Sequence, residues 1–186
     1  MTALSPTHYY LVGLGANLGD RADNIAHALS SLESDVRNTV VTCSKLWETP
    51  PHLPPDQALD PSARPHPKYL NACAVVKSEL APDPFLELLL STERAMGRVR
   101  DPSGPRYQPR PIDLDVILWS GGRFSSAVLE LPHPRFEERA FVLLPMQQVL
   151  SAMPAQAVKP YNLPALINAL PRADVKACTQ FGPVPR

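Results

Sequence analysis

Residues 112–119 read IDLDVILW, a short run of large apolar side chains that is interrupted by two aspartates. This composition predicts a β-strand. Because side chains alternate between the two faces of a strand, Asp113 and Asp115 share one face, and Leu114 and Val116 share the other. The strand therefore presents an apolar face on one side and two neighbouring carboxylates on the other.

The segments on either side of this strand have the periodicity of helices and further strands. Asp20 is a good N-cap, and apolar residues follow it at helical spacing, which predicts a helix over 21–34. Pro82 opens a second helix that Gly97 ends. The predicted elements are strands at 8–14, 38–47, 69–79 and 112–119, helices at 21–34, 82–96, 136–150 and 163–170, and a minor hairpin over 123–131. The βαββαβ order predicts an α+β fold of ferredoxin-like type, with a mainly antiparallel sheet flanked by helices.

Length and composition limit the classes of protein to consider. The 186 residues suffice for one sizeable core, so we expect a single domain over 1–170 and a flexible tail at 171–186. The 18 basic and 18 acidic residues cancel, which argues against nucleic-acid and membrane partners. No signal pattern and no apolar run of membrane-spanning length is present, so we expect a cytoplasmic location. We also expect a monomer, although no sequence feature determines the oligomeric state. The three cysteines are far apart and predict reduced, mostly buried thiols.

The two aspartates suggest a metal site. Like charges at positions 113 and 115 repel, and a bound dication would offset that repulsion. Carboxylate oxygens with no thiolate or imidazole nearby favour magnesium, which readily shares ligands with phosphates. The alternative is a solvated strand face whose neighbours neutralise the charge, which is the more common reading of an isolated DxD.

An arginine-rich loop precedes the aspartates. Arg98, Arg100, Arg106 and Arg110 fall within 13 residues, among prolines and a glycine. Guanidinium groups suit phosphate oxygens, and a metal beside arginines is what phosphoryl transfer requires. The alternative is a structural salt network in which the arginines pair with the aspartates and with Glu93.

Four other features of the sequence give weaker indications of function. The seven prolines between positions 50 and 67 predict a long loop, which is either a functional lid or disordered. His133 is either an ATP contact or a capped loop histidine. Phe141 would ordinarily be a core residue. The glycines of 13–19 lack both the GxGxxG spacing and a P-loop lysine, so we interpret this segment as a turn.

Several separated blocks resemble the 6-hydroxymethyl-7,8-dihydropterin pyrophosphokinase family of the folate pathway. They are GLGANLGD at 13–20, ETPP at 48–51, YLNACAVV at 69–76, ERAMGRVR at 93–100, YQPRPIDLDVIL at 107–118 and LPHPRFEERAFVLLPM at 131–146. They follow the family order across roughly residues 9–150. The resemblance implies the ferredoxin-like α+β fold and the transfer of pyrophosphate from ATP to the pterin hydroxymethyl group, which yields AMP.

The resemblance also implies roles for individual residues. Asp113 and Asp115 would hold two magnesium ions, and Arg98 and Arg110 would contact the phosphates and support catalysis. The pterin would be bound by Thr49, Pro50, Tyr69, Asn71 and Phe141. ATP would contact Glu93, Arg100, Tyr107, Arg110, Val116, His133 and Arg139. Adjacent folate enzymes are the partners that the resemblance suggests.

The sequence departs from the family pattern at two loops, 51–68 and 101–109, which are longer than in the short forms of the family. Both loops close over the substrates in the family, so their length bears on closure and on the outer pterin contacts.

Two other functions fit parts of the sequence. One is a non-catalytic RNA-binding α+β module, against which the neutral charge argues. The other is a family member that binds both substrates and regulates without reacting.

Overall fold

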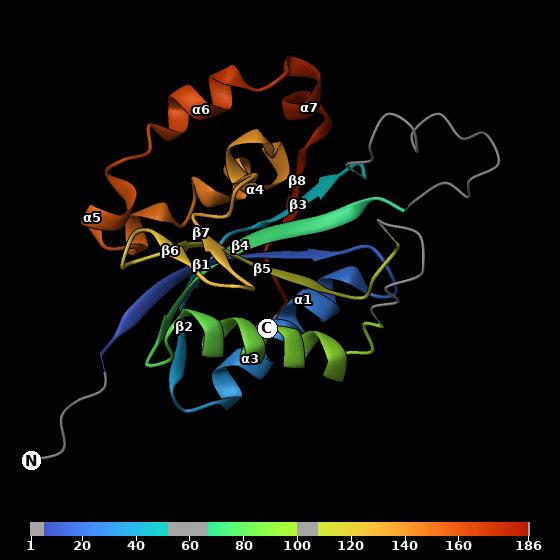
Figure 1. Cartoon of the computed structure of the whole chain (residues 1–186). Coiled ribbons are helices and arrows are strands. Elements are labelled where there is room, and N and C mark those ends of the chain that lie inside the picture. The colour runs from blue at the N-terminus through green and yellow to red at the C-terminus, as the bar shows by residue number, and fades with distance from the viewer. Residues whose placement is uncertain (1–5, 52–66, 100–107, 186) are drawn as a thin grey trace, which may run out of the picture.

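The computed structural model describes residues 6–51, 67–99 and 108–185, and it has an α+β architecture (Figure 1). The strands are β1 His8–Ala16, β2 Asn38–Cys43, β3 Leu46–Thr49, β4 Tyr69–Ser78, β5 Asp113–Trp119, β6 Phe124–Ser125, β7 Glu130–Leu131 and β8 Thr179–Gly182. The helices are α1 Arg21–Ser34, α3 Pro82–Ala95, α4 Ala140–Met146, α5 Ala155–Val158, α6 Leu163–Ala169 and α7 Arg172–Ala177, with 3-10 turns η1 Phe136–Glu138 and η2 Leu150–Ala152.

Six strands of the described residues form one sheet in the order β5-β1-β4-β3-β8, in which β2 also pairs with β4. All of the strand pairs recorded for this sheet are antiparallel. The separate β6–β7 ribbon follows β5 in the chain. The predicted fold class, an antiparallel sheet flanked by helices, is confirmed.

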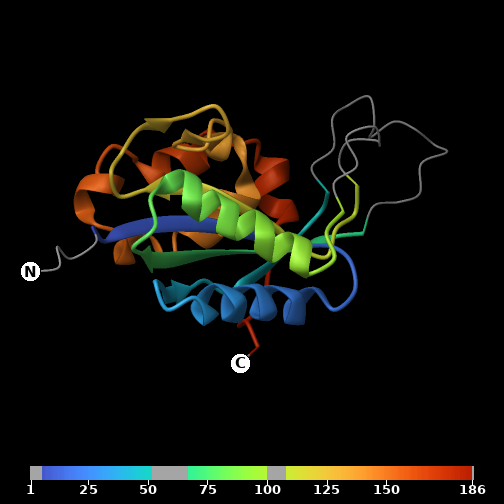
Figure 2. The same ribbon diagram turned by 60° about the horizontal axis from the view of Figure 1, so that its bottom comes forward.

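Each face of the sheet has its own hydrophobic core. On one face, α1 and α3 cover side chains such as Leu14, Leu114 and Val116. Figure 2 brings this face forward and shows both helices in front of the sheet. On the other face, α4 to α6 pack over Leu11 and Cys73, among others. Alternation along β4, and along β5 as far as Ile117, sends successive side chains to opposite cores, as the sequence pattern predicts; a register shift between β1 and β5 then places Leu118 in the same core as Ile117.

The strongly periodic elements match their predicted bounds closely. Helix α1 begins after Asp20, whose carboxylate accepts a hydrogen bond from the Asp23 N–H at 3.1 Å. Helix α3 ends just before Gly97, whose φ of +84° suits glycine. Strand β1, however, continues through Ala16, where a turn was predicted from position 15. It continues because β4 and β5 pair with it on both sides as far as Gly15.

Two segments near the C-terminus also differ from the predictions. The helix expected over 136–150 is divided into η1, α4 and a turn, and α4 contains Pro145, whose ring nitrogen cannot donate a helical hydrogen bond. Residues 171–186 were expected to be a flexible tail, but they contain α7 and β8. Strand β8 pairs with β3 and so belongs to the main sheet.

The expected lid or disordered loop at 50–67 lies largely outside the described residues, as does most of the arginine-rich loop with Arg100, Arg106 and Tyr107. Within the described ranges, none of the helices is both long and apolar enough to cross a membrane.

Candidate active site

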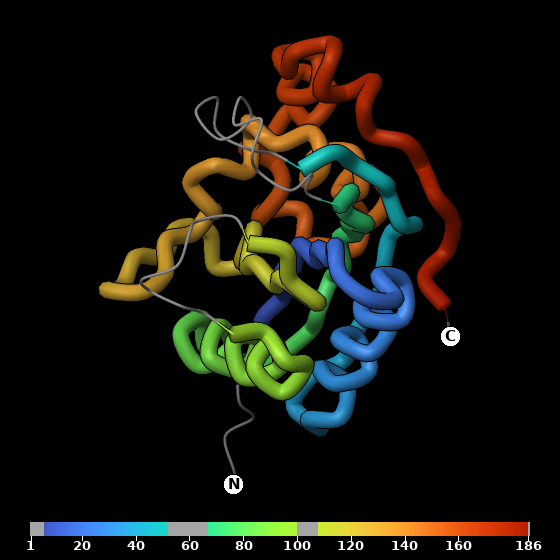
Figure 3. Tube along the Cα trace, turned by 90° about the vertical axis from the view of Figure 1, so that its right-hand side faces the viewer, coloured from blue at the N-terminus to red at the C-terminus, as the bar shows by residue number. Residues whose placement is uncertain are grey.

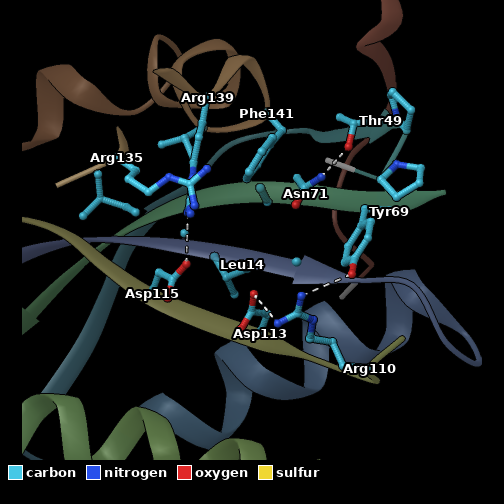
Figure 4. A pocket seen from close by; sticks show the side chains of 17 residues that line it. Leu14, Thr49, Tyr69, Asn71, Arg110, Asp113, Asp115, Arg135, Arg139 and Phe141 are labelled. Carbon is cyan, nitrogen blue, oxygen red and sulfur yellow. Dashed lines mark hydrogen bonds and ion pairs between the residues drawn. The ribbon is translucent and has the colours of Figure 1, made fainter. Parts of the chain in front are cut away.

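A cavity opens on the face of the sheet that α4 covers, above β1, β4 and β5 (Figure 4). Nine residues that the sequence analysis singled out line it, namely Thr49, Pro50, Tyr69, Asn71, Arg110, Asp113, Asp115, Arg139 and Phe141. They come from four separate segments of the chain. Folding therefore brings the acidic pair and the amide-and-aromatic set to one place.

Asp113 and Asp115 project from β5 into this cavity, while Leu114 between them is buried in the opposite core. On the neighbouring strand β1, the residues opposite them are Gly15 and Gly13. Withdrawal from water and the adjacent Asp113 carboxylate raise the pKa of Asp115 above its ordinary value, and Arg139 opposes this rise. The Asp115 side chain is 42% exposed and lines the cavity, so a cation that enters the cavity can reach it.

Among the described residues, three arginines face the acidic pair. Arg98 pairs with Asp113, and Arg110 Nη1 lies 3.2 Å from Asp113 Oδ2. Arg139 Nη1 lies 3.7 Å from Asp115 Oδ2. The ion pairs of the salt network that was one alternative from the sequence are therefore present. The guanidinium groups of Arg110 and Arg139 line the cavity, where they could also bind an anionic substrate, whereas Arg98 does not line it.

Glu93 and Asn17 hold the arginines in place from outside the cavity. The Glu93 side chain, 1% exposed at the end of α3, pairs with Arg98 and accepts a hydrogen bond from the Leu114 N–H at 2.8 Å. Asn17 Oδ1 accepts a hydrogen bond from the Arg110 N–H at 2.7 Å. The Asn17 N–H in turn donates to the Arg110 carbonyl at 3.2 Å. Both polar residues therefore tie the arginines to the β1 and β5 strands.

The other end of the cavity carries an amide and two rings. Asn71 Nδ2 donates a hydrogen bond to Thr49 Oγ1 at 2.8 Å, and both residues are buried. The Tyr69 and Phe141 rings lie near this amide, as Figure 4 shows. Arg110 lies over the Tyr69 ring at 5.9 Å from its centre, and its Nη2 donates to the Tyr69 hydroxyl at 3.4 Å. An amide between aromatic rings can bind a flat, polar heterocycle.

Some predicted residues do not line the cavity. The side chain of Val116 is 2% exposed and lies in the core on the opposite face, so only its main chain could contact a ligand of the cavity. His133 donates its N–H to the Ile117 carbonyl at 2.9 Å, and its Nδ1 accepts from the Arg135 N–H. Burial and the nearby Arg139 lower the pKa of His133. Arg100 and Tyr107 lie outside the described residues.

The sequence reading missed Gly13, Gly15 and Arg135, which also line the cavity. A Cβ on Gly15 would lie 2.8 Å from Asn71 Oδ1, so a side chain there would displace the amide. The usable signal was the spacing of two between the glycines, which puts them on one face of a strand. For Arg135, the sequence offered no signal beyond its charge.

The chemistry of the acidic pair fits magnesium. Within the described ranges, no group of three or more histidine, cysteine, aspartate and glutamate side chains could hold a metal. Two carboxylates are nevertheless the usual protein contribution to a magnesium ion that shares a nucleotide, because water and phosphate oxygens complete its coordination. Both carboxylates line the cavity, and the exposure of Asp115 leaves it accessible to a cation, which supports this fit.

Comparisons with known proteins agree with this geometry. A 2-amino-4-hydroxy-6-hydroxymethyldihydropteridine pyrophosphokinase from Methylorubrum extorquens is 40% identical over 143 residues, which cover 77% of this chain and 82% of the relative. The mitochondrial folate synthesis bifunctional protein of Arabidopsis thaliana is 36% identical over 148 residues, which cover 80% of this chain and 24% of the relative.

Solved structures show the same fold. A crystal structure of Plasmodium falciparum HPPK-DHPS with pterin and p-hydroxybenzoate superposes with a TM-score of 0.62 at 13% sequence identity. The match covers 88% of this chain and 43% of that one, so the present chain spans less than half of the length of the solved protein. The family model for 7,8-dihydro-6-hydroxymethylpterin-pyrophosphokinase matches residues 11–151, which include the β1, β4 and β5 strands and the cavity. The chain therefore belongs to the 7,8-dihydro-6-hydroxymethylpterin-pyrophosphokinase (HPPK) family.

Proposed function

We propose that this protein transfers the terminal pyrophosphate of ATP to the hydroxymethyl group of 6-hydroxymethyl-7,8-dihydropterin, which yields AMP and the pterin pyrophosphate for folate synthesis. Membership of the family supports this reaction. The observation that carries it is a single cavity with acidic and basic groups at one end and an amide between rings at the other. A phosphate chain and a flat heterocycle would meet there.

Different residues of the cavity would bind the two substrates. Asp113 and Asp115 would hold two magnesium ions, which would neutralise phosphate charge and orient the phosphate chain. Arg98 and Arg110 would contact the phosphates and stabilise the charge that develops during transfer. Arg139, together with the more distant Glu93, His133 and the main chain at Val116, would form the ATP side.

The pterin would lie at the opposite end. Its polar edge would be bound by the Asn71 amide and by the main chain at Thr49 and Pro50, and its ring would lie between Tyr69 and Phe141. The Asn71 amide is oriented by Thr49, and the Tyr69 hydroxyl by Arg110. The pterin half of the site is therefore organised before the substrate binds, which lowers the cost of binding.

The direct test is the identity of the nucleotide product. Purified protein with magnesium, ATP and the hydroxymethyl-dihydropterin should release AMP in step with pterin pyrophosphate, and a chelator such as EDTA should stop the reaction. Omission of the pterin is the control and should give no AMP. Release of ADP, or no turnover with magnesium present, would refute the proposed reaction.

We further propose a cytoplasmic monomer that works beside the adjacent enzymes of folate synthesis. The bifunctional relative from Arabidopsis thaliana, in which the matching region is joined to other sequence, supports such proximity. Size-exclusion chromatography with light scattering would measure the mass of the particle in solution, and a mass of twice 20.4 kDa would contradict the monomer.

A further inference from the structure

The C-terminal segment α7–β8, residues 172–182, lies beside the end of β3 that leads into the cavity. Figure 3 shows this last part of the chain, in red, running alongside the cyan strand β3. The segment lies beyond residues 11–151, which the family model matches. Its role therefore cannot be taken from that match.

Strand β8 pairs with β3 next to a residue of the cavity. Thr179 is opposite Glu48, and Gln180 is opposite Trp47. The residue after Glu48 is Thr49, which is 2% exposed and accepts the hydrogen bond from the Asn71 amide. A shift of β3 would therefore move the group that orients Asn71.

A second cavity lies between α7 and this wall of the first one. Thr49, Pro50, Pro51 and Phe141 line both cavities. The far side of the second cavity is formed in part by Asp174 and Cys178, at α7 and just after it. The proposed pterin contacts Thr49, Pro50 and Phe141 therefore lie between α7 and the first cavity. No side chain of α7 lines the first cavity itself.

Strand pairing on both sides limits how far β3 can move. β3 is four residues long and pairs with β4 on one side and with β8 on the other. Glu48 is held separately by Arg21 and Lys68 at 3.1 Å each. The side chains of Arg21 and Lys68 are at least a quarter exposed, and exposed ion pairs contribute little free energy. They therefore restrain β3 weakly compared with a ladder of main-chain hydrogen bonds.

We propose that α7–β8 is a positioning element for the pterin end of the active site: it fixes β3 so that Thr49 holds the Asn71 amide, and it has no part in ATP binding. This inference rests on the proposed function. The acidic end of the cavity lies on β5, on the far side of β1 and β4 from β3. Loosening β8 should therefore weaken pterin binding and leave ATP binding intact.

The test compares two double variants at exposed positions of β8. T179P/Q180P removes two successive N–H groups, one of which must face β3, because N–H groups alternate in direction along a strand. T179A/Q180A keeps both N–H groups and serves as the matched control. We expect the proline variant to bind pterin about tenfold more weakly, measured with magnesium and a non-hydrolysable ATP analogue, and to keep its ATP affinity within about twofold.

The result that would overturn the inference is a proline variant with unchanged pterin affinity, or with pterin and ATP affinities that fall together. A second measurement needs no variant: in the wild-type protein, pterin added to the ATP-analogue complex should slow amide hydrogen exchange in residues 179–182, because coupling between two sites is reciprocal. Unchanged exchange there would overturn the inference as well. Production of AMP by the wild-type protein and by the alanine control tests the proposed function separately.

Discussion

Asp113 and Asp115 occupy equivalent positions on β5 but have different surroundings. Asp113 is paired with Arg98 and Arg110, and 26% of its side chain is exposed. Among the described residues, the ion pair of Asp115 is the longer contact to Arg139, and 42% of its side chain is exposed; partial desolvation and the neighbouring Asp113 raise its pKa. In the absence of metal, the charge of Asp113 is therefore better compensated by nearby guanidinium groups than the charge of Asp115.

This asymmetry predicts different effects of two equivalent substitutions on stability. D113N should lower the free energy of unfolding by about 1–3 kcal/mol, because two guanidinium groups lose a charged partner. D115N should leave the metal-free protein equally stable or more stable, because a group with a raised pKa is unfavourable in its ionised form. Thermal unfolding in EDTA measures both.

The turnover rate of both variants should nevertheless fall about a thousandfold, because each variant loses a metal ligand. The bound metal ion contributes several kcal/mol to stabilising the transition state. The wild-type protein assayed with magnesium is the reference. A destabilised D115N would indicate that Asp115 belongs to a structural salt network, as one reading of the sequence allowed.

Gly15 gives a second prediction at the scale of a single residue. G15A should push the Asn71 amide away from Thr49, because the new Cβ would lie 2.8 Å from Asn71 Oδ1. Loss of that oriented hydrogen-bonding group should weaken pterin binding about tenfold and change ATP binding little. G13A is the matched comparison, since its Cβ would meet the Ile117 side chain at 3.3 and 3.5 Å and would not approach Asn71. Equal effects of the two substitutions on pterin affinity would argue against this role of Gly15.

The sequence could predict the elements whose pattern is strictly local. The helical repeat and the Asp20 cap give the bounds of α1, and alternation places Asp113 and Asp115 on one face. Strand β8 reads TQFG and lacks such a pattern, because it is held mainly by its pairing with β3. The division of 136–150 depends on how Pro145 and the turns around it pack. Packing of this kind joins distant residues and leaves little trace in the local sequence.

The candidate site likewise has residues that the sequence could predict and residues that it could not. The acidic pair follows from strand alternation, and most of the remaining positions follow from the family resemblance. The contribution of Gly15 could not be predicted, because it depends on Asn71 of a different strand. Val116 illustrates the reverse case: the resemblance places it at the ATP site, and alternation buries its side chain on the other face.

Helix α3 contributes to the site through one buried carboxylate. Glu93 joins α3 to β5 through the Leu114 N–H, and it also pairs with Arg98. E93Q keeps an acceptor for the N–H but weakens the pair with Arg98, so we expect turnover to fall by about tenfold and the fold to persist. E93A leaves a buried arginine without this partner and should cost about 3–5 kcal/mol of stability. Urea unfolding and steady-state kinetics separate the two effects, and wild-type stability of E93A would contradict the role given to Glu93.

On the scale of the whole molecule, the two cores on either side of the sheet determine how far the three cysteines are buried. Cys73 is fully buried, while Cys43 and Cys178 are half-buried. Burial raises the pKa of Cys43 to about 12 and, with Asp174, the pKa of Cys178 to about 11; it raises the pKa of Cys73 as well. All three therefore carry almost no thiolate near neutral pH, and the thiolate is the reactive form.

We therefore expect slow modification of all three thiols by Ellman's reagent at pH 8 in the folded protein. Rapid modification should follow only after unfolding in guanidinium chloride, when three thiols should react. The unfolded sample is its own control for the total. A thiol of the native protein that reacts as fast as free cysteine would show that one of the three lies in a more exposed or more positively charged environment.

The strand that carries the acidic pair lies at one border of the sheet, yet its outer side is partly occupied. The Leu114 N–H is bonded to Glu93, and the Ile117 carbonyl accepts from the His133 N–H at 2.9 Å. Unpaired border strands are where sheets of separate molecules join and aggregate. Glu93 and the segment around His133 therefore also protect this border from another chain, and they keep the carboxylates facing the cavity available to small, soluble ligands.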